Sequence, residues 1–202
     1  MTTSACVVLL PGFSRRAANL QVMSALCADQ GWDPIPVTLA PRALAPLYMS
    51  RARLRNVSRV ILRRCAGRPI VVVGHSAGGA AGCFIARCLA EAGADVRGLV
   101  LADGVDSPNG LIRQNLHELR GLRVSAVGAE PSACNRHGRL GESLRAVPWV
   151  HRVDVPGAGH GDFEGHGIAI YRRACGDTSS EETSDSYRRA VVREVAACLG
   201  PS

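Results

Sequence analysis

Residues 68–82 of the chain read RPIVVVGHSAGGAAG, and this stretch decides the fold. An isoleucine followed by three valines predicts a buried strand, and the small and apolar residues from Ala77 onward predict a helix. Between them, Ser76 lies in Gly74-His75-Ser76-Ala77-Gly78, with glycines where β-carbons would crowd a sharp turn. Such a turn projects the serine hydroxyl beyond the carboxyl end of the strand, where parallel sheets form their sites. Ser76 is therefore a candidate nucleophile; the alternative is that it only caps the helix.

The rest of the chain repeats this alternation of short β-branched runs and longer helical patterns. Because strands of this kind are buried on both faces, we expect a three-layer α/β/α sandwich around a mainly parallel sheet of about six strands, in one domain spanning residues 1–202. Pro36 favours an edge position for the second strand. The expected strands are 6–10, 34–39, 69–73, 96–102, 122–128 and 150–155, and the expected helices are 17–30, 47–65, 77–92, 109–120, 138–146 and 186–199.

Charge and composition exclude several classes of partner. The net charge is +7 and every basic residue is arginine, but these arginines are scattered and the aromatic content is only 4%. Nucleic-acid binding is therefore not expected. No apolar run approaches the roughly 18 residues of a membrane helix, and the N-terminal run lacks a basic region before it. We expect a cytoplasmic protein that acts on a small molecule, and the sequence does not predict its oligomeric state.

The cysteines indicate neither a metal site nor a redox motif. None are spaced as C-x-x-C, and most lie in apolar segments, where free cysteine behaves as a small buried hydrophobe. We therefore expect reduced thiols, no metal and no cofactor. The eight are Cys6, Cys27, Cys65, Cys83, Cys88, Cys134, Cys175 and Cys198.

A serine hydroxyl needs a base, which should follow it in the chain beyond the last strand. The segment VDVPGAGHGDFEG (153–165) places His160 in a loop of small residues at that edge, with His166 as a rival further on. His75 should point away from the Ser76 hydroxyl and serve packing or support.

An acid must orient the imidazole. Asp103 ends the strand 96–102, Asp106 follows it, and Glu130 follows the next strand, so all three lie at the expected edge. The turn after strand 122–128 would favour Glu130, but Pro131 follows it directly. We favour Asp103 and keep Glu130 and Asp106 as alternatives.

The backbone N–H groups of Phe13 and Ala77 are the candidate oxyanion donors, from the turn after the first strand and from the residue after the nucleophile. Two loops at the same edge carry apolar side chains that could grip a substrate: Tyr48, Met49, Leu111 and Ile112. These could equally be core contacts. Arg15 and Arg16 could meet a carboxylate, although a solvated role is the commoner one for arginine.

With these motifs in order along the chain, the protein resembles the α/β-hydrolases. The segments concerned are LPGF (10–13), GHSAGG (74–79), LADGVD (101–106) and PGAGHGDFE (156–164). The last two, with PSACN at 131–135, resemble the chlorophyllase-like branch. In that branch the triad acid follows the strand after the nucleophile helix, which implies Asp103. The chain departs from larger members by lacking two antiparallel strands and a cap domain, so a minimal form of the fold is expected.

The resemblance implies a serine esterase or thioesterase that acts through an acyl-enzyme on a small apolar or amphipathic substrate. Some members of the family have become non-hydrolytic. The alternative is therefore a non-hydrolytic protein of a biosynthetic pathway: an epimerase, a cyclase or a ligand-binding protein.

Overall fold

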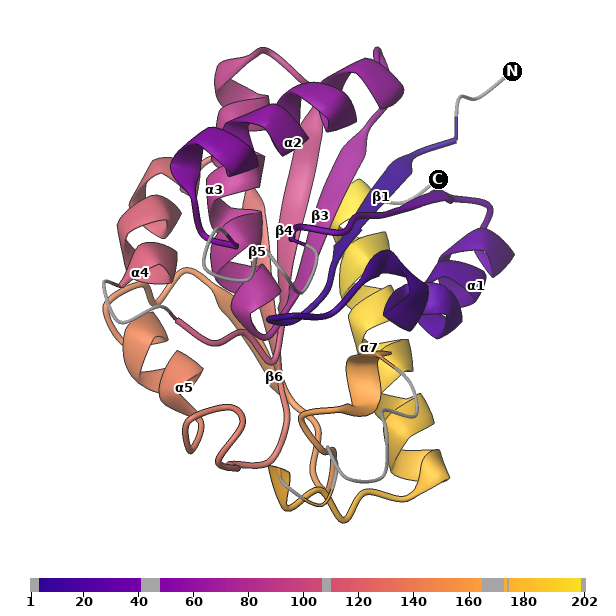
Figure 1. Cartoon of the computed structure of the whole chain (residues 1–202), viewed down its shortest axis with the longest axis vertical. Coiled ribbons are helices and arrows are strands. Elements are labelled where there is room, and N and C mark those ends of the chain that lie inside the picture. The colour runs from indigo at the N-terminus through magenta and orange to yellow at the C-terminus, as the bar shows by residue number, and fades with distance from the viewer. Residues whose placement is uncertain (1–3, 41–47, 107–109, 165–172, 174, 201–202) are drawn as a thin grey trace.

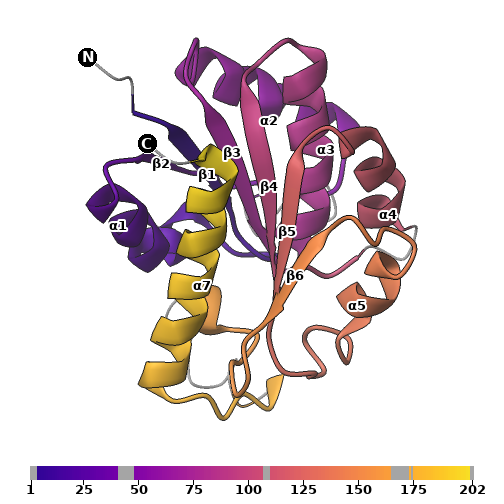
Figure 2. The same cartoon turned by 180° about the vertical axis from the view of Figure 1, so that it is seen from behind.

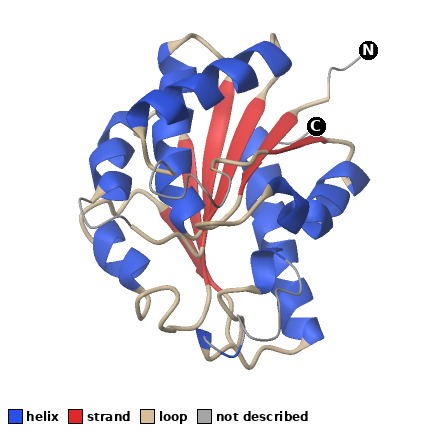
Figure 3. Ribbon diagram, in the orientation of Figure 1, coloured by secondary structure: helices blue, strands red, loops and turns tan. Residues whose placement is uncertain are grey.

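A computed structural model describes residues 4–40, 48–106, 110–164, 173 and 175–200. Its centre is a six-stranded, entirely parallel sheet in the order β2-β1-β3-β4-β5-β6 (Figures 1 and 3). The strands are β1 Cys6–Leu10, β2 Asp33–Pro36, β3 Ile70–His75, β4 Val96–Ala102, β5 Arg123–Gly128 and β6 His151–Asp154. The expected fold class is confirmed, and β2 with its two prolines lies at an edge, where a missing N–H donor costs least.

Helices cover both faces of the sheet. One face carries α2 Arg51–Arg64, α3 Ala77–Glu91, α4 Leu111–Leu116 and α5 Arg139–Leu144 (Figure 1). The other carries α1 Gln21–Asp29 and α7 Glu181–Leu199, which lie in front in Figure 2. Successive side chains of a strand point to opposite faces, so Val72 packs toward α2 and α3 while Val71 and Val73 pack toward α1 and α7. Every residue of β1 and β3 is buried, which explains their apolar sequences.

Several helix boundaries differ from the expected ones, among them the starts of α2 and α7. The expected helix 47–65 begins at Arg51 in the structure. The last helix begins at Glu181, five residues before the expected start, so residues 181–185 are helical as well. The cap is Ser180, whose hydroxyl accepts from the backbone N–H of Thr183. The spacing of apolar residues did not predict this first turn, because the turn is polar and its exposed side carries Glu181 and Glu182.

None of the helices described is both long enough and apolar enough to cross a membrane. The six strands all end at one edge of the sheet, so the loops after β1, β3, β4, β5 and β6 meet there. This edge positions the candidate site.

Candidate active site

Ser76 occupies a strained turn between β3 and α3. Its φ is +53°, a conformation that side chains rarely adopt. A β-carbon at Gly74 would lie 2.3 Å from the carbonyl oxygen of Gly78, and one at Gly78 would lie 2.5 Å from that of Pro11. The two glycines are therefore required for the strand, the helix and the first-strand turn to meet, and the serine hydroxyl is left at the tip.

Three side chains from distant parts of the chain form a continuous line of hydrogen bonds. His160 Nε2 lies 3.0 Å from Ser76 Oγ, and His160 Nδ1 lies 2.6 Å from Asp103 Oδ2. A carboxylate only accepts, so Nδ1 carries the proton and Nε2 is left to accept from the serine hydroxyl. All three residues are buried. This arrangement can withdraw the hydroxyl proton while the carboxylate stabilises the imidazolium that forms.

Asp103 is held in an acceptor role. It follows β4 directly, and its backbone also adopts a positive φ of 43°. Its carboxylate accepts from Asn135 Nδ2 at 3.0 Å and from the Ala129 N–H at 3.2 Å, in addition to His160. Burial alone would raise the pKa of Asp103, but the hydrogen bonds and the charge of His160 outweigh it and lower the pKa. The carboxyl group is therefore ionised at neutral pH.

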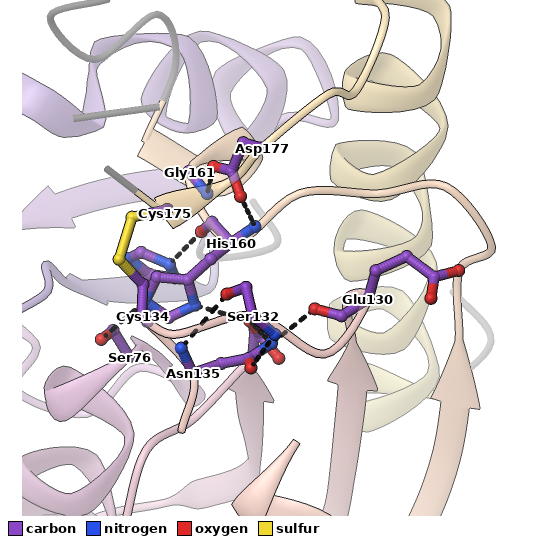
Figure 4. Close-up of a disulfide and its surroundings, with 11 residues drawn as sticks. Ser76, Glu130, Ser132, Cys134, Asn135, His160, Gly161, Cys175 and Asp177 are labelled. Carbon is purple, nitrogen blue, oxygen red and sulfur yellow. Dashed lines mark hydrogen bonds and ion pairs between the residues drawn. A yellow bond between two sulfur atoms is a disulfide. The ribbon is translucent and has the colours of Figure 1, made fainter. Parts of the chain in front are cut away.

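The two rival acids have other partners. Glu130 is exposed, its Oε1 accepts from the Gly157 N–H at 2.9 Å, and its carboxylate points away from His160 (Figure 4). Asp106 is buried, and its two oxygens accept from the Ile112 N–H and the Ser143 hydroxyl. It holds the start of α4. The rival base, His166, lies outside the described residues.

Two aspartates shape the loop that carries His160. Asp177 accepts from the backbone N–H groups of His160 and Gly161, at 3.1 and 2.9 Å. Asp162 accepts from the Gly159 N–H at 2.7 Å and from two serine hydroxyls, those of Ser179 just before α7 and Ser184 in its first turn. The loop is therefore fixed through its own backbone, on both sides of the imidazole.

Next to the serine, His75 takes part in a second buried charge network. Its Nδ1 lies 2.8 Å from Glu164 Oε1 and its Nε2 lies 2.8 Å from the backbone oxygen of His160. Because both nitrogens face acceptors, both carry protons. Burial would lower the pKa of His75, but the Glu164 carboxylate and the accepting backbone oxygen raise it instead. His75 therefore points away from the serine hydroxyl as a charged support for the histidine loop.

Glu164 links this network to the candidate oxyanion turn. Its Oε1 also accepts from the Gly12 N–H, and its Oε2 pairs with Arg15 Nε at 2.5 Å. Burial would raise the pKa of Glu164, but the charge of His75 and hydrogen bonds from His75, Gly12 and Arg15 lower it to about 2. The solvated role favoured for Arg15 is therefore wrong, because its part-buried guanidinium binds the buried carboxylate of Glu164.

A pocket of about 420 Å³ opens beside Ser76. Phe13, Met49, Ala77 and Val105 contribute to its lining. The N–H of Ala77 belongs to the first turn of α3, whose N–H groups have no acceptor within the helix. The lining is completed by Ala80, Asp106, Cys134 and Arg136.

The four apolar residues expected to bind substrate are separated by the structure. Met49 lines the pocket. Tyr48 is buried behind it, with its ring tilted at 59° to that of Phe13 at a centroid distance of 5.5 Å and its hydroxyl donating to the Pro11 carbonyl. At the start of α4, Ile112 lies in the core and the partly buried Leu111 packs against it; neither lines the pocket, which is the core alternative noted above.

The expectation of reduced thiols is wrong at one pair. Cys134 and Cys175 form a disulfide with Cα atoms 5.2 Å apart, and the other six cysteines are free (Figure 4). The two are 41 residues apart in the chain, so no local pattern marks them. The loops after β5 and after the His160 loop bring them together.

Sequence reasoning also missed three supporting residues: Asn135, Glu164 and Asp177. Asn135 and Glu164 each ended a segment that carried the family resemblance, but an amide and a carboxylate there indicated no particular partner. Asp177 lies in a polar acidic run that is typical of a solvated loop. Its buried hydrogen bonds arise only from the tertiary fold.

No family model and no curated protein matches the chain. Solved structures do match it over nearly its whole length. RedJ, a thioesterase from the prodiginine biosynthetic pathway in Streptomyces coelicolor, is 14% identical with a TM-score of 0.62, over 94% of this chain and 90% of that one. A pyrethroid hydrolase from Sphingobium faniae JZ-2 is 15% identical with a TM-score of 0.62, over 95% and 100%.

The NocB thioesterase domain, in covalent complex with a fluorophosphonate nocardicin G analogue, is 15% identical with a TM-score of 0.61, over 96% of each chain. Sequence identities this low show only that the chains share a fold. The chain therefore has the α/β-hydrolase fold, in a compact form whose described strands are all parallel. The finer resemblance to the chlorophyllase-like branch stays a prediction.

Proposed function

We propose that the chain is a serine hydrolase that cleaves an ester or thioester of a small apolar or amphipathic molecule. The observation that carries this is the line Ser76 Oγ–His160 Nε2–His160 Nδ1–Asp103 Oδ2, with distances of 3.0 and 2.6 Å. Ser76 is the nucleophile, His160 the general base and Asp103 the orienting acid.

In the proposed mechanism, His160 Nε2 takes the hydroxyl proton as Ser76 Oγ attacks the carbonyl carbon. The tetrahedral intermediate collapses and expels the alcohol or thiol, which takes the proton from His160. Water then gives a proton to His160 and attacks the acyl-enzyme. Collapse of the second intermediate releases the carboxylic acid and restores Ser76 with its proton.

The N–H groups of Phe13 and Ala77 are proposed to hold the oxyanion. Both residues border the pocket beside Ser76, and Ala77 adds the positive end of α3. The turn that carries Phe13 is anchored at the two residues before it, by Glu164 at Gly12 and by the Tyr48 hydroxyl at Pro11. Donors held in this way need little rearrangement when charge develops.

The substrate class follows from the size and lining of the pocket. A volume of about 420 Å³ suits a small molecule. Phe13, Met49, Ala80 and Val105 offer apolar contact, and Arg136 adds a charge. The names of the fold neighbours, two thioesterases and a pyrethroid hydrolase, support an ester or thioester as the scissile bond.

A fluorophosphonate probe and a series of p-nitrophenyl esters of graded chain length test the proposal on wild type and Ser76→Ala. We expect labelling of wild type at Ser76 and a loss of at least about 10⁴-fold in kcat for the variant. Ser76→Ala removes one oxygen from a pocket wall, so it should fold normally. Full activity in this variant would refute the proposed mechanism.

The non-hydrolytic alternative, an epimerase, cyclase or ligand-binding protein, makes a different prediction. A folded wild type that no fluorophosphonate labels, and that releases no p-nitrophenol from any ester of the series, would favour that alternative over the hydrolase.

A further inference from the structure

We propose that the Cys134–Cys175 disulfide is a positioning element for the reaction, which sets the acid and the base of the triad relative to each other. The inference rests on the proposed function. It assigns a role to two cysteines outside the hydrogen-bonded line of the triad, and it makes turnover depend on their oxidation state.

The acid is supported from the Cys134 side. Asn135 follows Cys134 directly, is 1% exposed, and donates through Nδ2 to Asp103 Oδ2 at 3.0 Å and to the Glu130 carbonyl at 2.8 Å. The carboxylate oxygen that it contacts is the one that faces His160. The direction of the Asp103 carboxylate therefore depends on where the Cys134 loop holds the Asn135 amide.

That loop is itself tightly organised. Asn135 Oδ1 accepts from the backbone N–H groups of Ser132 and Gly138, at 2.8 and 3.0 Å. All four polar contacts of the Asn135 amide thus lie within the loop or on the acid. A displacement of Cys134 would be transmitted to Asn135 because the two are adjacent and the loop moves as a unit.

The base is supported from the Cys175 side. Asp177, two residues after Cys175, accepts from the N–H groups of His160 and Gly161 (Figure 4). A β-carbon at Gly159 would lie 2.8 Å from Asp177 Cγ, so the aspartate packs closely against the histidine loop. The position of the imidazole therefore depends on the segment that carries Cys175.

The disulfide joins these two supports. Cys134 also lines the pocket beside Ser76, so the bond lies at the site itself (Figure 4). It is the covalent link between the loop that aims the acid and the segment that holds the base. Errors of about 1 Å in such a geometry cost on the order of 100-fold in rate.

Reduction by dithiothreitol is the direct perturbation. A thiolate of the reagent attacks one sulfur, and its second thiol closes the ring. Two electrons pass to the protein, leaving thiols at Cys134 and Cys175 and oxidised dithiothreitol in solution. We expect kcat on a p-nitrophenyl ester to fall by about tenfold or more, with KM within about threefold, because the main loss concerns proton transfer and Cys134 is only one of the nine residues that line the pocket. Oxidised glutathione should restore kcat.

The matched variants are Cys134→Ala/Cys175→Ala and, as a control at a free cysteine on α3, Cys88→Ala. The double variant should show the low kcat and no further response to reductant, while Cys88→Ala should behave as wild type. Each protein is assayed at least 15 °C below its measured melting temperature, so that unfolding does not enter. Should the double variant not fold, reduction and reoxidation of wild type give the same comparison.

Asn135→Ala tests whether the disulfide affects kcat through the Asn135 amide. If the disulfide acts through this amide, reduction of Asn135→Ala should cost less than reduction of wild type, since the two changes share one pathway. Fully additive losses would contradict that route. Reduced wild type or a folded double variant with unchanged kcat would overturn the inference while the proposed function stands. An oxidised wild type that neither reacts with fluorophosphonate nor hydrolyses ester would overturn both.

Discussion

The backbone N–H of Gly12 donates to Glu164 Oε1 at 2.5 Å, across 152 residues of chain. This bond joins the turn after the first strand to the loop that carries His160. The same carboxylate pairs with His75 and Arg15, so one buried side chain supports both the proposed oxyanion turn and the histidine loop.

Replacing Glu164 should therefore impair the oxyanion turn. We expect Glu164→Ala to lower kcat by about tenfold to 100-fold, somewhat less than removal of an oxyanion donor itself. Glu164→Gln keeps an acceptor for Gly12 and should lose less. Rates of fluorophosphonate labelling, measured beside kcat, check this. Equal loss in both variants would show that charge, and not the hydrogen bond to Gly12, is what matters.

The His75–Glu164 pair predicts a stability optimum in mild acid. The pKa of Glu164 falls from 4.5 to about 2 on folding, so its contribution is complete above about pH 4.5 and is lost as the pH falls toward 2. The pKa of His75 is raised from 6.5, so its contribution is complete below about pH 6.5 and is lost as the pH rises through the folded value.

Urea unfolding across pH 2–9 measures this effect. The shift of Glu164 corresponds to roughly 3 kcal/mol as an upper bound. Glu164→Gln should flatten the acid limb of the free energy of unfolding relative to wild type. An unchanged acid limb would mean that folding does not lower the pKa of Glu164.

Substitution of each carboxylate identifies the acid. We expect Asp103→Asn to lower kcat by about 10³–10⁴-fold, because an amide favours the wrong imidazole tautomer. Glu130→Gln should stay within about twofold, since its carboxylate contacts the Gly157 N–H and not the imidazole. Asp106→Asn should lower stability more than kcat, because Asp106 holds α4. A large loss of kcat in Glu130→Gln would reassign the acid.

Alanine substitutions at two glycines separate the cost of a steric clash from the effect of glycine's backbone freedom. A β-carbon at Gly74 meets the Gly78 carbonyl at 2.3 Å, while Gly121 has nothing within 4 Å. We expect Gly74→Ala to cost about 3 kcal/mol or more and Gly121→Ala to stay within about 0.5 kcal/mol. Urea midpoints compare them. A Gly74→Ala protein of wild-type stability would show that the turn is looser than the structure has it.

Alkylation can show how many cysteines are free and how many are held in the disulfide. Alkylation of the denatured, unreduced protein should modify six cysteines, and alkylation after reduction should modify eight. Mass spectrometry distinguishes these numbers. Closing a loop of 41 residues predicts a stability loss on reduction of about 4 kcal/mol. Eight modified cysteines without reductant would show that the bond does not form.

Much of this protein follows from local patterns. The strands Cys6–Leu10 and Val96–Ala102 lie where their apolar runs predicted. The serine turn could be recognised because Gly74 and Gly78 leave no space for β-carbons. Helix ends were less predictable, because the polar first turn of α7 has no apolar face.

The amino-acid sequence by itself determined the alternating architecture, the parallel sheet and the candidate residues Ser76, His160 and Asp103, since burial and steric exclusion act over a few neighbouring residues. Only the tertiary structure decided the rest. It placed Asp103, and not Glu130, beside His160, paired Glu164 with Gly12, and brought Cys134 to Cys175. These contacts join loops far apart in the chain, and their geometry exists only once the whole sheet has set where each strand ends.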